Sequence, residues 1–210
     1  MTFLFDLDGT LLDSTDLLLA GYKHTARTHL GLETTDEHWL PHFGSPLRDQ
    51  MALLSEEQAD AMVSTYRVFY QANHDLLLRL YPAVPELLKE LKANGHRLGV
   101  VTSKLTRFAV RGLELFGIDG LFDAIIGESD TALHKPNPEP VLLALERIGA
   151  CPADAWMVGD SSYDLLAGRA AGCRTAAALW GPFTRAALEP YSPDLFLDHP
   201  LDLLTLAAAA

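Results

Sequence analysis

The stretch Thr2-Phe3-Leu4-Phe5-Asp6-Leu7-Asp8-Gly9-Thr10 is a short apolar run that meets two carboxylates and then a glycine. Such a run predicts a buried strand that ends at a turn. Carboxylates two positions apart lie on the same side of an extended chain, because side chains alternate between its two faces. Asp6 and Asp8 are therefore expected to face one crevice.

Further apolar runs of strand length follow at 98–101, 124–126, 156–158 and 175–179. Between them, apolar residues recur at three- and four-residue spacing, and these helical patterns end before Gly95, Gly117 and Gly149. Alternation of strands with helices is typical of βαβ units. The chain is therefore expected to form an α/β core, with a doubly wound, Rossmann-like parallel sheet covered on both faces.

One part of the chain does not alternate in this way. After the first strand it shows helical periodicity and no clear strand until the next apolar run. Within it, Ser55-Glu56-Glu57-Gln58 matches a capping box, which predicts a helix that reaches about Asn73. We therefore expect an α-helical cap domain at 15–81, inserted into a core domain made of 1–14 and 82–210.

Composition narrows the class of protein. Lys and Arg number 16 and Asp and Glu 28, so the formal net charge is 16 − 28 = −12, which argues against nucleic-acid or anionic-membrane partners. No apolar run approaches the ~18 residues of a membrane span. The two cysteines form no C-x-x-C pair, so neither a disulfide framework nor a zinc site is indicated. We expect a cytoplasmic monomer or homodimer.

Three later segments place reactive residues where the predicted strands end, which is where a doubly wound sheet binds its ligand. Thr102-Ser103-Lys104 offers hydroxyls and backbone N–H groups where a helix begins, a suitable cradle for the oxygens of an anion. His134-Lys135-Pro136 is a stiff loop that presents a cation. The segment from Gly159 to Asp164 is again acidic.

In this order, D-x-D-G-T, the lone Thr102, Lys135-Pro136 and G-D-x-x-x-D resemble the haloacid dehalogenase-like hydrolases, and among them the phosphoglycolate-phosphatase and pyrophosphatase branch. The resemblance covers nearly the whole chain. It also accounts for the helical insertion, since many members carry a cap between the first and second motifs. It implies a Mg²⁺-dependent phosphatase that acts on a small phosphorylated metabolite.

The resemblance assigns the two carboxylates of the first motif to the reaction. Asp6 matches the nucleophile that forms an aspartyl-phosphate, a role that suits a carboxylate because it is ionised at neutral pH without a base. Asp8 matches the general acid and base, which protonates an alkoxide leaving group and later activates water. Mg²⁺ would be bound by Asp6, the Asp8 carbonyl and Asp160, since it prefers oxygen ligands.

The resemblance implies supporting roles for the other motif residues. Lys135 would neutralise charge on the phosphoryl oxygens and on the nucleophile, while Thr102 and the N–H of Ser103 would hold those oxygens. Asp164 would orient either Lys135 or the metal shell. Gly9, at the turn after the carboxylates, is a supporting residue.

Several alternatives remain. Asp8 argues against dehalogenation, because haloacid dehalogenases lack the second aspartate. Leu18 stands where related phosphomutases carry a cap histidine, twelve residues beyond the nucleophile, which weakens a mutase assignment without removing it. A monoester such as 2-phosphoglycolate is our first choice of substrate and pyrophosphate the alternative, with Arg48 of the cap as the expected fork for a carboxylate or second phosphate. A non-catalytic phosphate-binding module is the alternative from another class.

Overall fold

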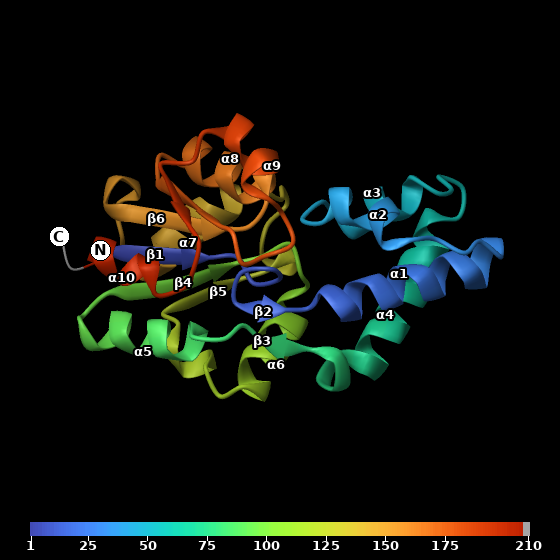
Figure 1. The fold of residues 1–210 in the computed structure, drawn as a ribbon, viewed down its shortest axis with the longest axis horizontal. Helices are drawn as coiled ribbons and strands as arrows, with labels where there is room; N and C mark the ends of the chain where they lie inside the picture. The colour runs from blue at the N-terminus through green and yellow to red at the C-terminus, as the bar shows by residue number, and fades with distance from the viewer. Residues whose placement is uncertain (208–210) are drawn as a thin grey trace. The chain divides into compact units, whose positions relative to one another are not determined.

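A six-stranded parallel sheet forms the core of the structure, a computed structural model that describes residues 1–207 (Figure 1). Its strands lie in the order β5-β4-β1-β6-β7-β8. Numbered along the chain this is 3-2-1-4-5-6, the order of dinucleotide-binding doubly wound folds. The predicted fold class is therefore confirmed. The strands are β1 (Thr2–Phe5), β4 (Arg97–Val101), β5 (Ala124–Ile126), β6 (Ala155–Gly159), β7 (Arg174–Ala178) and β8 (Leu195–Leu197).

The first strand lies at the centre of the sheet, and its register positions the site. Phe5, the last residue of β1, pairs with Val100 of β4 on one side and with Val158 of β6 on the other. The chain therefore leaves all three strands at one edge of the sheet. Beyond that edge the backbone N–H of Asp6 still donates to the Val158 carbonyl, at 2.9 Å. This contact fixes the direction in which the first motif leaves the strand.

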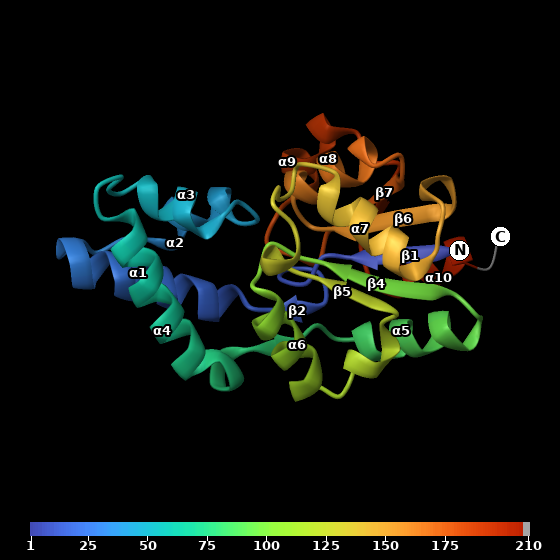
Figure 2. The same cartoon turned by 180° about the vertical axis from the view of Figure 1, so that it is seen from behind.

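Helices cover both faces of the sheet (Figures 1 and 2). The helices α7 (Glu139–Ile148) and α8 (Ser162–Ala170) pack on one face, in front of the sheet in Figure 2. On the other face α5 (Val84–Ala93) packs against β4 and against α10 (Asp202–Ala207). Apolar side chains from both the sheet and the helices are buried between the layers, so burial of apolar surface stabilises this arrangement.

The remaining elements of the core are short, apart from α6 (Thr106–Leu115), which packs against β5. The short ones are α9 (Arg185–Leu188), η2 (Asp119–Leu121), η3 (Glu128–Asp130), η4 (Pro152–Asp154) and η5 (Glu189–Tyr191). No helix in the described part of the chain is both long enough and apolar enough to cross a membrane. The predicted cytoplasmic location and the monomeric or dimeric state stay predictions.

The chain divides into two compact units. One comprises Met1–Asp13 and the chain from Leu80 onward, and the other is Ser14–Arg79. These bounds differ by one or two residues from the domain bounds expected from the sequence. At the two crossings β2 (Leu12–Asp13) and β3 (Arg79–Leu80) form a separate two-stranded sheet.

The inserted unit is helical and has an aromatic core of its own. The ring of Tyr22 stacks on Trp39 at 4.8 Å between centroids and on Tyr66 at 4.9 Å. Gly21 permits this packing, because a Cβ there would lie 2.7 Å from the Tyr66 ring. The helices are α1 (Thr15–Leu30), α2 (Asp36–Trp39), η1 (Leu40–His42), α3 (Leu47–Ala52) and α4 (Ala59–Leu77).

Three details differ from the sequence-based expectation. The short strand β3 lies in a part of the chain where no strand was expected. The helix predicted from Ser55 begins at Ala59 and ends at Leu77. Its start is later than predicted because the Gln58 N–H donates to the Ser55 hydroxyl (3.3 Å) in a turn that precedes the helix. The edge strand β8 was not predicted, because its three apolar residues stand between Ser192-Pro193-Asp194 and Asp198-His199-Pro200, which are typical of loops.

Candidate active site

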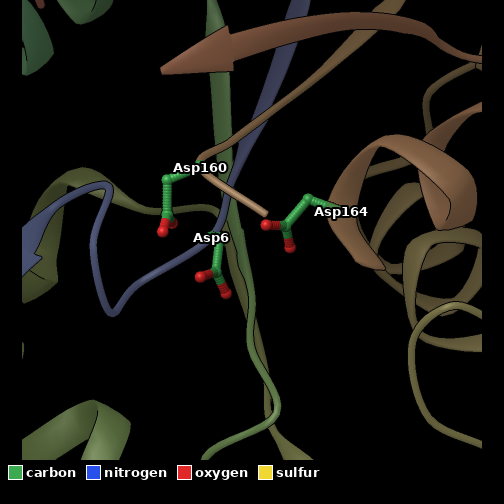
Figure 3. A group of neighbouring side chains, drawn as sticks. All are labelled: Asp6, Asp160 and Asp164. Atoms are coloured by element: carbon green, nitrogen blue, oxygen red, sulfur yellow. The ribbon is translucent and has the colours of Figure 1, made fainter. Parts of the chain in front are cut away.

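Three buried carboxylates converge beyond the carboxyl edge of the sheet. Asp6 follows β1, Asp160 follows β6, and Asp164 lies in the first turn of α8 (Figure 3). One carboxylate oxygen from each lies within 4.8 Å of the others. The fold therefore brings together residues that are more than 150 positions apart, as the order of the motifs predicted.

An ammonium group lies among these carboxylates. Nζ of Lys135 donates to Oδ1 of Asp6 at 2.6 Å, to Oδ1 of Asp164 at 2.5 Å and to the Val101 carbonyl at 3.1 Å. An ammonium has three N–H donors, so these acceptors use all of them. Three carboxylates and one ammonium, if all are ionised, leave a net charge of −2 in a buried volume. Such a cluster requires further positive charge.

The pKa values of the cluster reflect this missing charge. Burial and the nearby Asp164 raise the pKa of Asp6 to about 7, although Lys135 lowers it. Burial, Asp6 and Asp164 raise the pKa of Asp160 well above its ordinary value, against a hydrogen bond from Thr10 that lowers it. Burial lowers the pKa of Lys135, but Asp164 and Asp6 outweigh it and raise that pKa above its usual range. A divalent cation would relieve the repulsion between the carboxylates.

Asp164 is held by the start of its own helix. Its Oδ2 accepts hydrogen bonds from the backbone N–H of Ser161 at 3.0 Å and from the Ser161 hydroxyl at 2.6 Å, while its Oδ1 accepts from Lys135. Ser161 and Asp164 form a capping box at the start of α8. Both oxygens of Asp164 are thus engaged within the protein, and it is Lys135 that they position. The S-x-x-D pattern could have pointed to Ser161, which the sequence analysis did not single out.

The loop after Asp8 fixes Asp160. Its Thr10 hydroxyl donates to Oδ1 of Asp160 at 2.9 Å, and the Trp180 indole N–H donates to the Thr10 carbonyl at 2.8 Å. Gly9 has a φ of +86°, and a Cβ at this position would lie 2.4 Å from Oδ2 of Asp160. Only glycine combines this backbone conformation with so close an approach to a carboxylate.

Substitution of Gly9 by alanine should therefore destabilise the protein for two separable reasons. Gly95 is a matched control, because its φ is +78° and a Cβ there would meet nothing within 4 Å. Gly95→Ala should lower the free energy of unfolding by about 1–2 kcal/mol through its backbone alone. Gly9→Ala should cost about 1–3 kcal/mol more, because the methyl group displaces Asp160. Urea unfolding measures both, and equal losses would mean that the Asp160 contact is unimportant.

The second carboxylate of the first motif has a different partner. Oδ1 of the half-buried Asp8 accepts a hydrogen bond from Nζ of Lys104 at 2.6 Å. Thr102 is buried at the end of β4, and its hydroxyl accepts the backbone N–H of Lys104 at 3.2 Å. Ser103, half-buried, lies between them in the chain. Lys104 belongs to the second motif, and no role was predicted for it.

Arg48 belongs to the inserted unit and pairs with residues of that unit. Its guanidinium donates to Glu56 at 2.9 Å and to Asp60 at 3.0 Å, and all three side chains are exposed. An exposed ion pair of this kind stabilises the protein by only about 0–1 kcal/mol, so the guanidinium can leave these carboxylates for another anion at little cost. The predicted contact of Arg48 with a substrate stays a prediction.

A doubly wound parallel sheet with buried carboxylates and a lysine beyond its strand ends is suited to bind a metal ion and an anion. Residues 3–178 match the family of haloacid dehalogenase-like hydrolases. The chain belongs to this family, which confirms the predicted resemblance. The match spans both compact units and every motif residue discussed above.

Curated relatives and solved structures are similar over nearly the full length. Pyrophosphatase PpaX from Bacillus velezensis is 42% identical over 201 residues, which cover 96% of this chain and 93% of the relative. Pyrophosphatase PpaX from Bacillus cereus is 39% identical over 98% of this chain and 95% of its own length. A structure described as a predicted phosphoglycolate phosphatase from Haemophilus somnus is 28% identical, with a TM-score of 0.89 and coverage of 98% and 97%.

Proposed function

We propose that this hydrolase is a Mg²⁺-dependent phosphatase that forms an aspartyl-phosphate on Asp6. The observation that carries the proposal is the buried cluster in which Lys135 joins Asp6 to Asp164 beside Asp160. The cluster supplies a nucleophile, a fixed cation and surplus negative charge for a metal ion. Positioning and electrostatics of this kind provide most of the catalysis in phosphoryl transfer.

The donor set fits magnesium. Asp6 and Asp160 each bind a protein donor through Oδ1, and we assign the Oδ2 atom of each to the metal, together with the main-chain carbonyl of Asp8. Oxygen ligands and a surplus charge of −2 suit a hard divalent cation. Asp164 is not assigned to the metal, because both of its oxygens accept hydrogen bonds from Lys135 and Ser161. When bound, Mg²⁺ lowers the repulsion between the carboxylate nucleophile and the phosphate.

In the first step a carboxylate oxygen of Asp6 forms a bond to phosphorus, and the bond between phosphorus and the leaving-group oxygen breaks. Lys135 holds Asp6 in place through Oδ1 and offsets charge that develops on the phosphoryl group. The buried Thr102 hydroxyl and the N–H of Ser103 are assigned to the phosphoryl oxygens. The nucleophile is thus preorganised by contacts that exist before substrate binds.

Asp8 completes the cycle. It lies two residues beyond the nucleophile and is less buried, so it can exchange protons with the leaving group and with water. In the first step it protonates the oxygen of the leaving group, which is an alkoxide in a monoester and a phosphate in pyrophosphate. In the second step it takes a proton from the water whose oxygen bonds to phosphorus, the bond from phosphorus to the Asp6 oxygen breaks, Asp6 is regenerated and inorganic phosphate is released.

The names of the curated relatives favour pyrophosphate as the substrate. The curated proteins that are 39–42% identical over nearly the whole chain carry the name pyrophosphatase. Phosphoglycolate is the second candidate, supported by the structure from Haemophilus somnus at 28% identity. A monoester was the first choice from the sequence and pyrophosphate the alternative. The motifs contact only the phosphoryl group, so they do not distinguish the two substrates.

A substrate panel tests this proposal. We expect the purified protein to hydrolyse pyrophosphate, 2-phosphoglycolate and p-nitrophenyl phosphate with Mg²⁺, with the highest kcat/KM on pyrophosphate, and to lose this activity in EDTA. Excess Mg²⁺ should restore it. A protein that binds phosphate compounds without metal-dependent turnover would be a binding module and would contradict the proposal.

A further inference from the structure

The sequence contains five lysines, and two of them form ion pairs with the two carboxylates of the first motif in this acidic protein. Lys135 contacts Asp6, and Lys104 contacts Asp8 through a 2.6 Å ion pair. The side chain of Lys104 is only 8% exposed, so its charge is largely withdrawn from solvent. Withdrawing two charges from water costs free energy that their mutual attraction does not always repay, so this ion pair is weak evidence for a purely stabilising role. The second lysine therefore calls for a function of its own.

The main chain around Lys104 is fixed on both sides. Its backbone N–H donates to the Thr102 hydroxyl at 3.2 Å, and its carbonyl accepts the N–H of Glu128 at 2.8 Å. Gly127 allows this contact, because a Cβ there would lie 2.6 Å from the Lys104 carbonyl oxygen. Lys104 is thus a side chain built onto a rigid loop, with its ammonium directed at the first motif.

We propose that Lys104 is the cation for the leaving group, and that it makes the site selective for substrates whose leaving group already carries negative charge. The proposal rests on the proposed function, in which Asp6 is the nucleophile and Asp8 acts on the leaving group. Both candidate substrates have such a leaving group: phosphate in pyrophosphate, and in 2-phosphoglycolate the glycolate, which departs through its 2-oxygen and carries a carboxylate.

The two lysines divide the charge of the substrate between them. Lys135 uses its three donors on Asp6, Asp164 and the Val101 carbonyl, so it stays with the nucleophile. The leaving group departs on the side opposite the nucleophile, next to the residue that protonates it. Lys104 contacts that residue, Asp8, and so lies on the leaving-group side.

The chemical step gives Lys104 its effect. A carboxylate oxygen of Asp6 bonds to phosphorus, the bond from phosphorus to the bridging oxygen breaks, and its electron pair departs on that oxygen. With pyrophosphate the product is an inorganic phosphate anion, which an ammonium stabilises directly. With p-nitrophenyl phosphate the leaving group is uncharged in the bound substrate, so the same ammonium contributes less to binding it.

Lys104→Met tests the proposal through the ratio of kcat/KM on pyrophosphate to kcat/KM on p-nitrophenyl phosphate. This constant reports the steps up to departure of the leaving group, so the later hydrolysis of the aspartyl-phosphate does not affect it. We expect the ratio to fall by about 30-fold, the effect of one charged hydrogen bond. Lys104→Arg should keep the ratio within about threefold of native, since it retains the charge.

Lys92→Met is the matched control, because Lys92 forms a more exposed ion pair with Asp123 at 3.0 Å, 31% and 36% exposed. It should leave the ratio unchanged. Retained hydrolysis of p-nitrophenyl phosphate shows that each variant is folded. Equal losses on both substrates would overturn the assignment of Lys104, and so would a native protein that hydrolyses p-nitrophenyl phosphate but neither anionic substrate. A native protein with no Mg²⁺-dependent turnover would instead contradict the proposed function.

Discussion

Asp6→Asn is expected to lower Mg²⁺-dependent turnover by at least about 10⁴-fold, the scale of loss when a covalent nucleophile is removed. The amide has nearly the shape of the carboxylate but is not a nucleophile at neutral pH. It also withdraws one of the assigned metal ligands. The measurement is phosphate release from pyrophosphate and from p-nitrophenyl phosphate, at saturating Mg²⁺.

Thermal unfolding separates this loss from misfolding. Burial and Asp164 raise the pKa of Asp6 to about 7 from its ordinary 3.8, so the folded protein binds a proton more tightly than the unfolded chain. Ionisation of Asp6 therefore lowers the free energy of unfolding as the pH rises from 3.8 to about 7. Without Mg²⁺ at pH 8, Asp6→Asn should be at least as stable as the native protein. A variant that keeps more than a tenth of native turnover would exclude Asp6 as the nucleophile.

Lys135→Met is expected to have the largest effect on stability. It removes the ammonium and leaves Asp6, Asp160 and Asp164 buried together, which should lower the free energy of unfolding by about 3–5 kcal/mol at pH 8 without Mg²⁺. Turnover should fall by about 10²–10³-fold, because one fixed charge no longer stabilises the transferred phosphoryl group.

The loss of stability in Lys135→Met should depend on pH. Lys135 lowers the pKa of Asp6, so without it that pKa rises further and the folded state binds a proton more tightly than the unfolded state. Stability must then decrease as pH rises, and the variant should recover on going from pH 8 to pH 5. Added Mg²⁺ should rescue it at pH 8. Lys92→Met, which breaks a more exposed pair, should change stability by less than about 1 kcal/mol. A pH-independent loss in Lys135→Met would show that packing, and not charge, is what the lysine supplies.

The fold could be predicted from the sequence because its signals are local. Each central strand is a short apolar run, and the helix over 139–148 carries its apolar residues at helical spacing and ends before Gly149. The strand β8 was missed because Pro and Asp residues typical of loops flank its three apolar residues on both sides. The start of α4 was placed too early because Ser55 accepts its hydrogen bond in a turn and not at the helix start.

The members of the site were accessible to sequence analysis, but their pairing was not. Asp6, Lys135 and Asp160 follow from motif order and strand ends. Whether Asp164 contacts Lys135 or the metal depends on rotamers that no pattern encodes, and the structure shows the lysine contact. The ion pair between Asp8 and Lys104 joins residues 96 positions apart, so no local signal announces it.

The central claim is that the phosphoryl group passes through Asp6. Native protein is mixed with pyrophosphate and Mg²⁺, quenched in acid during turnover, digested and analysed by mass spectrometry. We predict one added phosphoryl group on the peptide that contains Asp6, located on that side chain and missing from Asp6→Asn. Turnover without a phosphorylated Asp6, or a phosphoryl group on another side chain, would contradict the account.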